Sequence, residues 1–393
     1  MFPLVVTPLL AHLVGAAWAQ DAPPVEWSPL LQVRQRLLVG DRDATDDLAA
    51  GLSVSQRARL GLGVRRLGVS ARVSFQDVRK WTATSDIAAP SAFLPSIAEG
   101  WVRVEGDLTR NVGAVATLGR QPLTLHEGRI LGADEFSPEG QFFDAFRVEG
   151  RLSPVSIEYV NARRFLDPDQ DPLGLGVNVF RLGASAENPM TAWTADAVWV
   201  VDARRTAETT STAGVWLQFD TGRWRGRAEG YLQSSQAGTG TLVGLSGGWV
   251  FGPDERLVVY ARYDGLSGDA LDASGNAVPG GAAAWQPVLG DSRRFQGLLG
   301  RFDGPEDSDG RGLADAHLVV EARVGRPIAT SLAFHRFWSP LDGGGFGNEI
   351  DGTARWSFSP FATAGLGGAW FAPDAAFDRT HRLFAYLELD AAF

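Results

Sequence analysis

The chain has 393 residues, of which 45% are hydrophobic and 21% charged, and its formal net charge is −10. A mean hydropathy of −0.06 is too low for a bundle of membrane helices, and no run of 18 apolar residues follows the amino-terminal stretch, so the sequence excludes a membrane-spanning helix. Cysteine is absent, which excludes disulfides and cysteine metal sites, and the acidic balance argues against a nucleic-acid partner.

The amino terminus has the features of a secretory signal peptide. An apolar stretch is followed by Ala17, Trp18 and Ala19, which match the Ala-x-Ala cleavage pattern, although no Lys or Arg precedes the stretch. The alternative, an amino-terminal strand, is disfavoured by Pro3 and Pro8. We expect a signal peptide over 1–19, a short periplasmic lead over 20–29 and a single barrel domain over 30–393.

From Leu30 onward, segments of about ten residues alternate apolar and polar side chains between turn residues, which is typical of a transmembrane β-barrel. In the segment 224–233, Arg225 and Arg227 alternate with small or apolar residues. An arginine facing lipid at mid-depth would cost roughly 2–4 kcal/mol, so this polar face must line a wet interior. The expected strands are 30–39, 53–64, 69–75, 101–108, 111–118, 142–152, 155–165, 177–186, 192–202, 213–220, 224–233, 242–251, 257–263, 295–302, 317–324, 328–338, 350–358, 362–371 and 383–393.

The segments number 18 or 19, depending on whether 295–302 is a wall strand or part of a loop. Single-chain bacterial barrels have even strand numbers, and a lipid-exposed sheet edge would leave backbone groups unpaired. We therefore predict an all-β fold, a closed antiparallel up-and-down barrel of about 18 strands, with 16 as the alternative. Short periplasmic turns and long extracellular loops are expected to alternate, the longest loop being 264–294.

Three stretches of the sequence carry a family resemblance. They are 119–148, with a Gly-Arg-Gln strand end, a Gly-Arg loop and a Phe-Asp-Ala strand start; 295–313, with Arg-Phe-Asp-Gly; and 347–373, with Gly-Asn-Glu-Ile-Asp leading to Trp-Phe-Ala-Pro. Their order resembles the alginate-export family of bacterial outer-membrane barrels, and the resemblance covers essentially the mature chain.

This resemblance implies an 18-stranded barrel in the bacterial outer membrane, with an electropositive lumen suited to a polyuronate. It places Arg120, Arg129, Asp144 and Arg147 on the family's motif. The terminal strand ending in Phe393 resembles the signal read by the barrel-assembly machinery. The other partners implied are outer-membrane lipid and lipopolysaccharide, and export of a polymer would need a separate periplasmic partner.

The basic residues of the polar faces are arginines. Lys80 is the only lysine among the 36 basic residues, a bias that a GC-rich genome would also produce. The guanidinium fork binds carboxylates bidentately and stays charged. The candidate substrate-binding residues of the lumen are Arg57, Arg59, Arg72, Arg103, Arg120, Arg129, Asp144, Arg147, Arg225, Arg227, Arg262, Arg323 and Arg355. The alternative is that these charges pair with acidic residues across strands and only stiffen the wall.

An enzymatic function has little support in the sequence. His335 and Ser331 share one face of a strand by alternation, but no Gly-x-Ser-x-Gly or His-Glu-x-x-His motif is present. The acidic loop 167–172 is more typical of a plain turn than of a cation site. We therefore expect no catalytic residue, no metal and no cofactor.

The sequence thus predicts an outer-membrane channel that passively conducts or exports an anionic substrate through an arginine-lined lumen. The expected substrate is an acidic polysaccharide such as alginate, or a related organic anion. The near balance of acids and arginines weighs against strong anion selectivity. The alternatives are a general porin or loop-plugged structural barrel and, as a minor alternative, an outer-membrane hydrolase.

Overall fold

The computed structural model describes residues 24–40, 52–82, 96–164, 176–188, 190–203, 209–252, 256–270, 281–325, 327–378 and 380–393. The expected signal peptide and the acidic loop 167–172 lie outside the described residues. Among the residues described, no helix is both long and apolar enough to cross a membrane.

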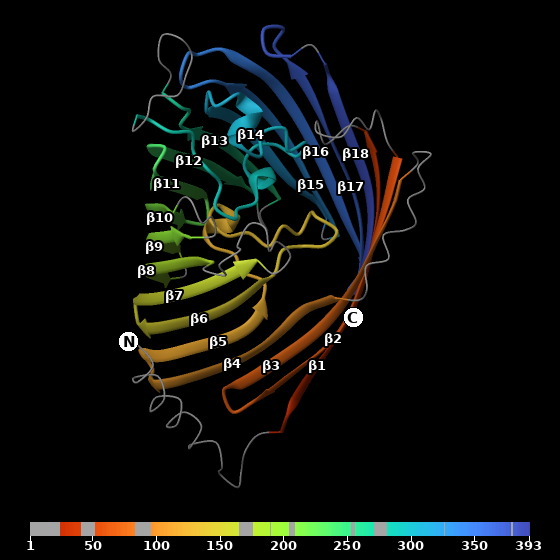
Figure 1. The fold of residues 1–393 in the computed structure, drawn as a ribbon. Helices are drawn as coiled ribbons and strands as arrows, with labels where there is room; N and C mark the ends of the chain where they lie inside the picture. Colours follow the sequence, from red (N-terminus) through yellow and green to blue (C-terminus); the bar gives the residue numbers. More distant parts are fainter. Residues whose placement is uncertain are drawn as a thin grey trace.

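Eighteen antiparallel strands form one closed barrel (Figure 1). The strands are β1 (Glu26–Gly40), β2 (Leu52–Arg66), β3 (Val69–Thr82), β4 (Ser96–Thr109), β5 (Val112–Gln121), β6 (Phe143–Leu152), β7 (Val155–Arg164), β8 (Val177–Asn188), β9 (Thr191–Asp202), β10 (Thr210–Asp220), β11 (Trp224–Ser234), β12 (Thr239–Phe251), β13 (Leu257–Leu266), β14 (Leu313–Val324), β15 (Ile328–Trp338), β16 (Gly345–Ser359), β17 (Ala362–Pro373) and β18 (Arg382–Ala392). Sequence neighbours pair, and β1 closes the ring on β18, with Gln32 opposite Ala392 and Gly40 opposite Phe384. The predicted 18-stranded antiparallel barrel is confirmed, and the 16-stranded alternative is wrong.

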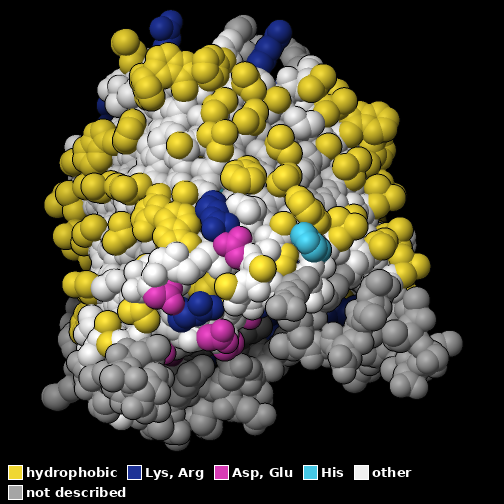
Figure 2. Space-filling model, turned by 90° about the horizontal axis from the view of Figure 1, so that it is seen from above, with side chains coloured by type: hydrophobic (Ala, Val, Ile, Leu, Met, Phe, Trp, Pro, Cys, Tyr) yellow, Lys and Arg dark blue, Asp and Glu magenta, His cyan; other side chains and the backbone are white. Residues whose placement is uncertain are grey.

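The inner and outer faces alternate along each strand, as the sequence predicts. In β2, Leu60 is 64% exposed on the outer face, whereas Arg57 is 2% exposed on the inner face. Figure 2 shows the outer side chains as a broad apolar belt in which charged side chains are few. Exposed tryptophans near strand ends are Trp81, Trp199, Trp356 and Trp370. An apolar belt bounded by aromatic residues matches the hydrocarbon and headgroup layers of a bilayer.

One end of the barrel carries short turns, and the other carries long connections. For example, residues 67–68 join β2 to β3, and residues 110–111 join β4 to β5. At the opposite end, two long connections fold into the barrel (Figure 1). We call residues 122–142, between β5 and β6, the first inner loop. The second inner loop, between β13 and β14, is residues 267–312, of which 267–270 and 281–312 are described.

The apolar side chains of the two inner loops pack inside the barrel. Phe302 of the second inner loop lies against Phe337 and Phe371 of the wall, with ring centroids 4.9 and 6.1 Å apart. The buried cluster also contains Leu123, Ile130, Leu131, Trp285 and Leu299 from the loops, and Phe143, Val177, Val198, Tyr231 and Leu242 from the wall. The hydrophobic core of this protein therefore lies within the lumen at the long-loop end.

The second inner loop decides two points that the sequence left open. The segment 295–302 is not a wall strand, because Phe295, Leu299 and Phe302 are buried in the lumen instead of facing outward. The long connection expected over 264–294 does not simply project outward, since β13 continues to Leu266 and the chain then turns into the barrel. Periodicity alone did not distinguish an apolar loop packed in the lumen from an apolar strand facing lipid.

Several strands extend beyond the ends that side-chain alternation predicts. β1 begins at Glu26, inside the stretch expected to be a periplasmic lead, because residues from Glu26 onward pair with β2. β3 continues to Thr82 rather than ending at 75, and β16 begins at Gly345 rather than at 350. Polar residues, glycine or proline interrupt the alternation there, while the backbone ladder continues.

Candidate functional site

The two inner loops join into one layer across the lumen, which we call the septum. Gly132 N donates to Leu289 O at 2.9 Å, and Leu289 N donates to Ile130 O at 3.1 Å. Asp291 N donates to Gly128 O at 2.8 Å. The first loop leaves the wall at β5 and β6 and the second at β13 and β14, which lie far apart around the ring of 18 strands. The septum therefore narrows any passage through the barrel.

Arg129 anchors the first inner loop to the far wall. Its Nε and Nη2 donate to Glu229 Oε1 at 3.1 and 2.8 Å, and Nη2 also donates to Asp264. The guanidinium lies 3.6 Å from the centroid of the Phe295 ring in the second loop. Burial on its own would lower the pKa of Arg129, but the Asp264 and Glu229 carboxylates raise it above its usual value. The buried cation is thus held charged between one loop and the wall.

The backbone before Arg129 adopts an uncommon conformation that gives the loop its sharp turn. His126 and Glu127 have φ angles of 52° and 55°, in the left-handed region that non-glycine residues rarely occupy. The His126 ring offsets this strain, since its Nδ1 lies 2.7 Å from the Tyr231 hydroxyl and the ring stacks on Trp216 at 5.1 Å. The wall therefore holds the turn that delivers Arg129.

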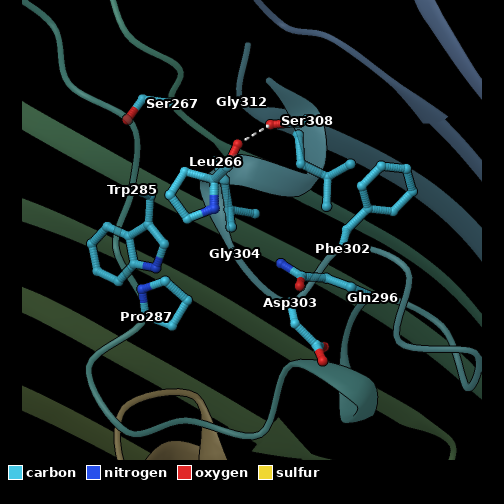
Figure 3. A pocket seen from close by; sticks show the side chains of 12 residues that line it. Leu266, Ser267, Trp285, Pro287, Gln296, Phe302, Asp303, Gly304, Ser308 and Gly312 are labelled. Carbon is cyan, nitrogen blue, oxygen red and sulfur yellow. Dashed lines mark hydrogen bonds between the residues drawn. The ribbon is translucent and has the colours of Figure 1, made fainter. Parts of the chain in front are cut away.

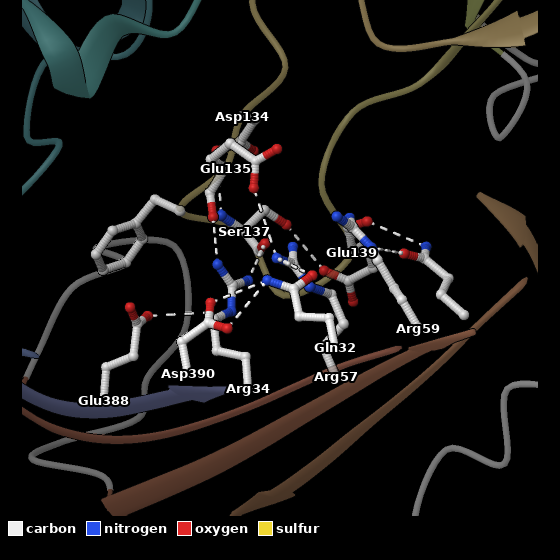
Figure 4. A network of polar contacts seen from close by, with 12 residues as sticks. Gln32, Arg34, Arg57, Arg59, Asp134, Glu135, Ser137, Glu139, Glu388 and Asp390 are labelled. Carbon is white, nitrogen blue, oxygen red and sulfur yellow. Dashed lines mark hydrogen bonds and ion pairs between the residues drawn. The ribbon is translucent and has the colours of Figure 1, made fainter. Parts of the chain in front are cut away.

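Four arginines on β1 and β2 face the septum, of which Arg36 donates to the Phe136 carbonyl and to Glu388. We call Arg34, Arg57 and Arg59 the basic row; Arg34 lies opposite Arg57 in the strand register, and Arg59 follows two residues later on the same face (Figure 4). All three are buried. Arg59 Nε donates to Gln76 Oε1 at 3.1 Å. Arg57 Nε, Arg57 Nη1 and Arg59 Nη2 have no hydrogen-bond partner within the described part of the chain.

Main-chain carbonyls of the first inner loop hold one end of the basic row. Arg34 Nη1 and Nη2 donate to the carbonyls of Glu135 and Ser137 at 2.6 and 2.9 Å (Figure 4). Arg57 Nη2 lies 3.5 Å from Glu135 Oε2, a carboxylate that is itself largely exposed. Arg34 Nε also lies 4.0 Å from Glu388 Oε2, so carboxylates compensate part of the positive charge of the row. The carbonyl oxygens satisfy the other donors of Arg34 without cancelling its charge.

A second basic region is a hollow at the short-turn end of the barrel. It has a volume of ≈ 280 Å³ and is lined by Arg225, Arg323 and Arg355, together with Glu321 and small hydroxyl residues. Arg323 is exposed, and neither it nor Arg262 forms an ion pair with any described residue; Arg262 lies 4.8 Å from the Tyr260 ring centroid instead. Arg355 of the hollow lies 3.6 Å from Glu388 Oε1, and Arg34 of the basic row lies 4.0 Å from Oε2 of the same carboxylate, so the two basic regions meet at Glu388.

The other predicted arginines are neutralised by acidic neighbours. The pairs are Arg72 with Glu99 at 3.8 Å, Arg103 with Glu105 at 3.2 Å, Arg120 with Asp144 at 2.8 Å, Arg147 with Glu149 at 3.7 Å and with Glu158, and Arg227 with Glu229 at 3.5 Å and Asp264 at 3.7 Å. These arginines therefore match the alternative given above, in which charges pair across strands and stiffen the wall. In the hollow as well, Arg225 pairs with Asp220 at 2.8 Å and Arg355 with Glu388 at 3.6 Å, so most of the predicted arginines have an acidic partner.

Two cavities border the septum. One, of ≈ 170 Å³, is lined by Gln76, Arg120, Glu139 and Phe142 and lies between the first inner loop and the wall at β3 to β5. The other is enclosed by the second inner loop between Trp285, Phe302 and Ser308 (Figure 3) and measures ≈ 20 Å³. A space of that size holds about one water molecule. Only the first cavity can admit an organic solute.

Sequence reasoning missed several of the residues at this site. Arg34 was recognised on a polar face but not as a candidate, and the loop carbonyls that hold it carry no sequence signal. Ser331 and His335 share one face of β15, as alternation implies, but four residues along a strand separate them by roughly 13 Å, so they do not pair. His335 instead contacts Asp315 at 2.9 Å. A cluster of His317, His335 and neighbouring carboxylates was also not foreseen.

The closed 18-stranded ring, its apolar belt and its inward loops define the fold of a bacterial outer-membrane β-barrel. In fold the chain is similar to the Pseudomonas aeruginosa outer-membrane protein OpdK, with a TM-score of 0.64 at 12% identity over 94% of this chain and 98% of that one. It is also similar to P. aeruginosa OprD, with a TM-score of 0.62 at 10% identity over 95% and 97%, and to Acinetobacter baumannii OccAB1, with 0.61 at 12% over 93% and 96%. No family model and no curated protein sequence matches the chain, so the expected alginate-export membership gains no support.

Proposed function

We propose that this protein is a constricted outer-membrane channel for small organic anions, with carboxylates as the preferred class. The observation that carries the proposal is the basic row, in which buried guanidinium groups of Arg57 and Arg59 retain donors without partners beside the septum. Buried donors of this kind cost free energy unless they serve a ligand. A carboxylate is the ligand that a guanidinium fork fits best.

The arrangement of the two basic regions favours passage of an anion through the barrel over tight binding of that anion. The basic row lies at the level of the septum, and the hollow lined by Arg225, Arg323 and Arg355 lies at the short-turn end, which faces the periplasm in this class of barrel. Separate weak sites along a passage let an anion enter and leave. A structure of OpdK with vanillate, a carboxylate, shows that a protein of similar fold takes such a solute.

The septum favours a small solute over a polymer. Hydrogen bonds between the two inner loops and the Arg129 anchor tie opposite parts of the lumen together, so a polyuronate chain would pass only after these contacts broke. Alginate export remains the finer version of the sequence-based hypothesis. A general porin is the competing proposal, and the many paired charges of the wall favour it.

Liposome swelling tests the proposal. Proteoliposomes with the mature chain should swell faster in isosmotic benzoate than in a neutral sugar of similar size, and an oligouronate should not permeate. Replacing Arg57 and Arg59 with Gln should reduce the benzoate rate toward that of the sugar. Equal rates for the two solutes would support a general porin, and rapid oligouronate entry would support polymer transport.

A further inference from the structure

A second polar cluster lies on the inner wall, away from the basic row. The antiparallel register brings it together: His317 of β14 is opposite His335 of β15, which is in turn opposite Glu349 of β16. Asp315 and Asp351 are two residues away from His317 and Glu349 on the same inner face. Strand pairing alone therefore gathers two imidazoles and three carboxylates at one place in the lumen.

The distances within the cluster are short. Asp315 Oδ2 lies 2.9 Å from His317 Nδ1 and 2.9 Å from His335 Nδ1, and His335 Nε2 lies 3.5 Å from Asp351 Oδ2. The two imidazole rings stack with centroids 4.3 Å apart. One ligand atom from each of Asp315, His317 and His335 falls within 4.8 Å of the others. A single cation between these atoms could contact all three residues.

The cluster is fully enclosed and rich in negative charge. Asp315 and Glu349 are 0% exposed, and His317, His335 and Asp351 are buried as well. Each of the three carboxylates has one oxygen in contact with a neighbour, while its other oxygen, Asp315 Oδ1, Glu349 Oε2 or Asp351 Oδ1, has no hydrogen-bond partner in the described residues. Burying three carboxylates is costly unless cations compensate them.

We propose that Asp315, His317 and His335 bind a divalent transition-metal ion, with Zn²⁺ as the representative, and that Asp351 orients His335 through its other ring nitrogen. Imidazole nitrogen with carboxylate oxygen is a zinc donor set, whereas Ca²⁺ and Mg²⁺ prefer oxygen ligands alone. Glu349 lies beside the set, opposite His335 in the strand register. The site is separate from the basic row, and it does not depend on which solute the barrel conducts.

The metal would also fix the second inner loop. Leu298 N donates to Asp351 Oδ2 and Leu299 N donates to Glu349 Oε1, each at 2.9 Å. Asp351 also contacts His335 Nε2 at 3.5 Å, so a metal ion on His335 would hold the carboxylate that accepts the hydrogen bond of Leu298 N. Metal binding is therefore linked to the position of the septum.

Zinc titration of the folded barrel tests the proposal. The full mature chain without a polyhistidine tag is refolded in detergent, stripped with EDTA and titrated with Zn²⁺ in a calorimeter, and bound metal is counted by mass spectrometry after gel filtration. We expect one zinc per chain, and loss of this stoichiometric binding in a His317→Asn, His335→Asn double variant. The control is His381→Asn, an exposed histidine stacked on Trp370, which should bind zinc like the parent chain.

A second measurement holds even where the double variant fails to fold. X-ray absorption at the zinc edge of the loaded parent chain should show a nitrogen and oxygen shell at about 2.0–2.1 Å with the outer scattering of two imidazoles. Substoichiometric binding by the folded parent chain, a shell without imidazole scattering, or unchanged binding in a folded double variant would overturn the proposal.

Discussion

Arg129 and Glu229 lie 100 residues apart in the sequence, yet the guanidinium of Arg129 donates two hydrogen bonds to one oxygen of the Glu229 carboxylate, at 3.1 and 2.8 Å. This contact joins a loop that leaves the wall at β5 to the inner face of β11. It makes the first inner loop part of the core instead of a surface appendage. The width of the lumen therefore depends on the same interactions that stabilise the fold.

Replacing Arg129 with Ala should destabilise the barrel by about 3 kcal/mol, because the buried Glu229 and Asp264 would keep only the more distant Arg227, at 3.5 and 3.7 Å, as a cation. Guanidinium unfolding followed by tryptophan fluorescence in detergent measures this change. The matched control is Arg103→Ala, whose half-exposed pair with Glu105 should contribute only about 0–1 kcal/mol. Equal effects of the two substitutions would contradict the anchoring role of Arg129.

The sequence predicted the barrel because a membrane wall has a strict two-residue period. Leu60 faces outward and Arg57 and Arg59 face inward, as the alternation requires. The same rule could not decide whether 295–302 is a wall strand or a loop, since Phe295, Leu299 and Phe302 are apolar for a different reason: they fill the lumen. Periodicity indicates which side chains avoid water, but it does not indicate whether lipid or the inside of the barrel surrounds them.

The candidate site was less predictable than the wall. Of the arginines placed on polar faces, alternation could not show which ones have acidic partners, because Arg129 meets Asp264 across 135 positions of the chain. The cluster of His317 and His335 needs the hairpin register of β14 and β15, which turn position alone sets. These contacts depend on tertiary structure and leave no local pattern.

Asp291, in the septum, should make the docked loops more stable at mildly acidic than at neutral pH. Burial, and then the nearby Asp134 carboxylate, raise the pKa of Asp291 above its usual value. A group whose pKa is higher in the folded state stabilises that state below its unfolded pKa of about 3.9, and this contribution is lost as the pH rises through the folded pKa. Asp291→Asn should therefore raise the free energy of unfolding at pH 7, and the gain should shrink as the pH falls toward 4.

Glu139 provides the opposite case for the same experiment. Burial would raise its pKa, but the hydrogen bond and charge of Lys80 more than offset burial and lower it. The contribution of ionised Glu139 to the free energy of unfolding is present above the pKa that Glu139 has in the unfolded chain. It is lost as the pH falls through the lower pKa that Glu139 has in the folded protein. Glu139→Gln should thus lower the free energy of unfolding at pH 7. If both substitutions shift stability in the same direction at pH 7, the assigned electrostatics of the septum are wrong.

Gly297 should be intolerant of any side chain. Its φ is +91°, and a Cβ at this position would lie 2.5 Å from Glu349 Oε1, the atom that accepts the hydrogen bond of Leu299 N. We expect Gly297→Ala to destabilise the fold by about 1–3 kcal/mol through strain and loss of that docking contact. Gly247→Ala is the control, because a Cβ there meets nothing within 4 Å. Chemical unfolding of both variants compares their midpoints. A wild-type midpoint for Gly297→Ala would refute the docked position of the second inner loop.

The most direct test of the central claim is the zero-current potential of the refolded mature chain in a planar bilayer under a tenfold KCl gradient. An arginine-lined constriction predicts a potential of the sign for preferential chloride passage, and the Arg57→Gln, Arg59→Gln double variant should move it toward zero. Arg151→Gln, which removes a charge from an exposed pair with Asp107, should leave it unchanged. A cation-selective or unselective current from the parent chain would contradict the account.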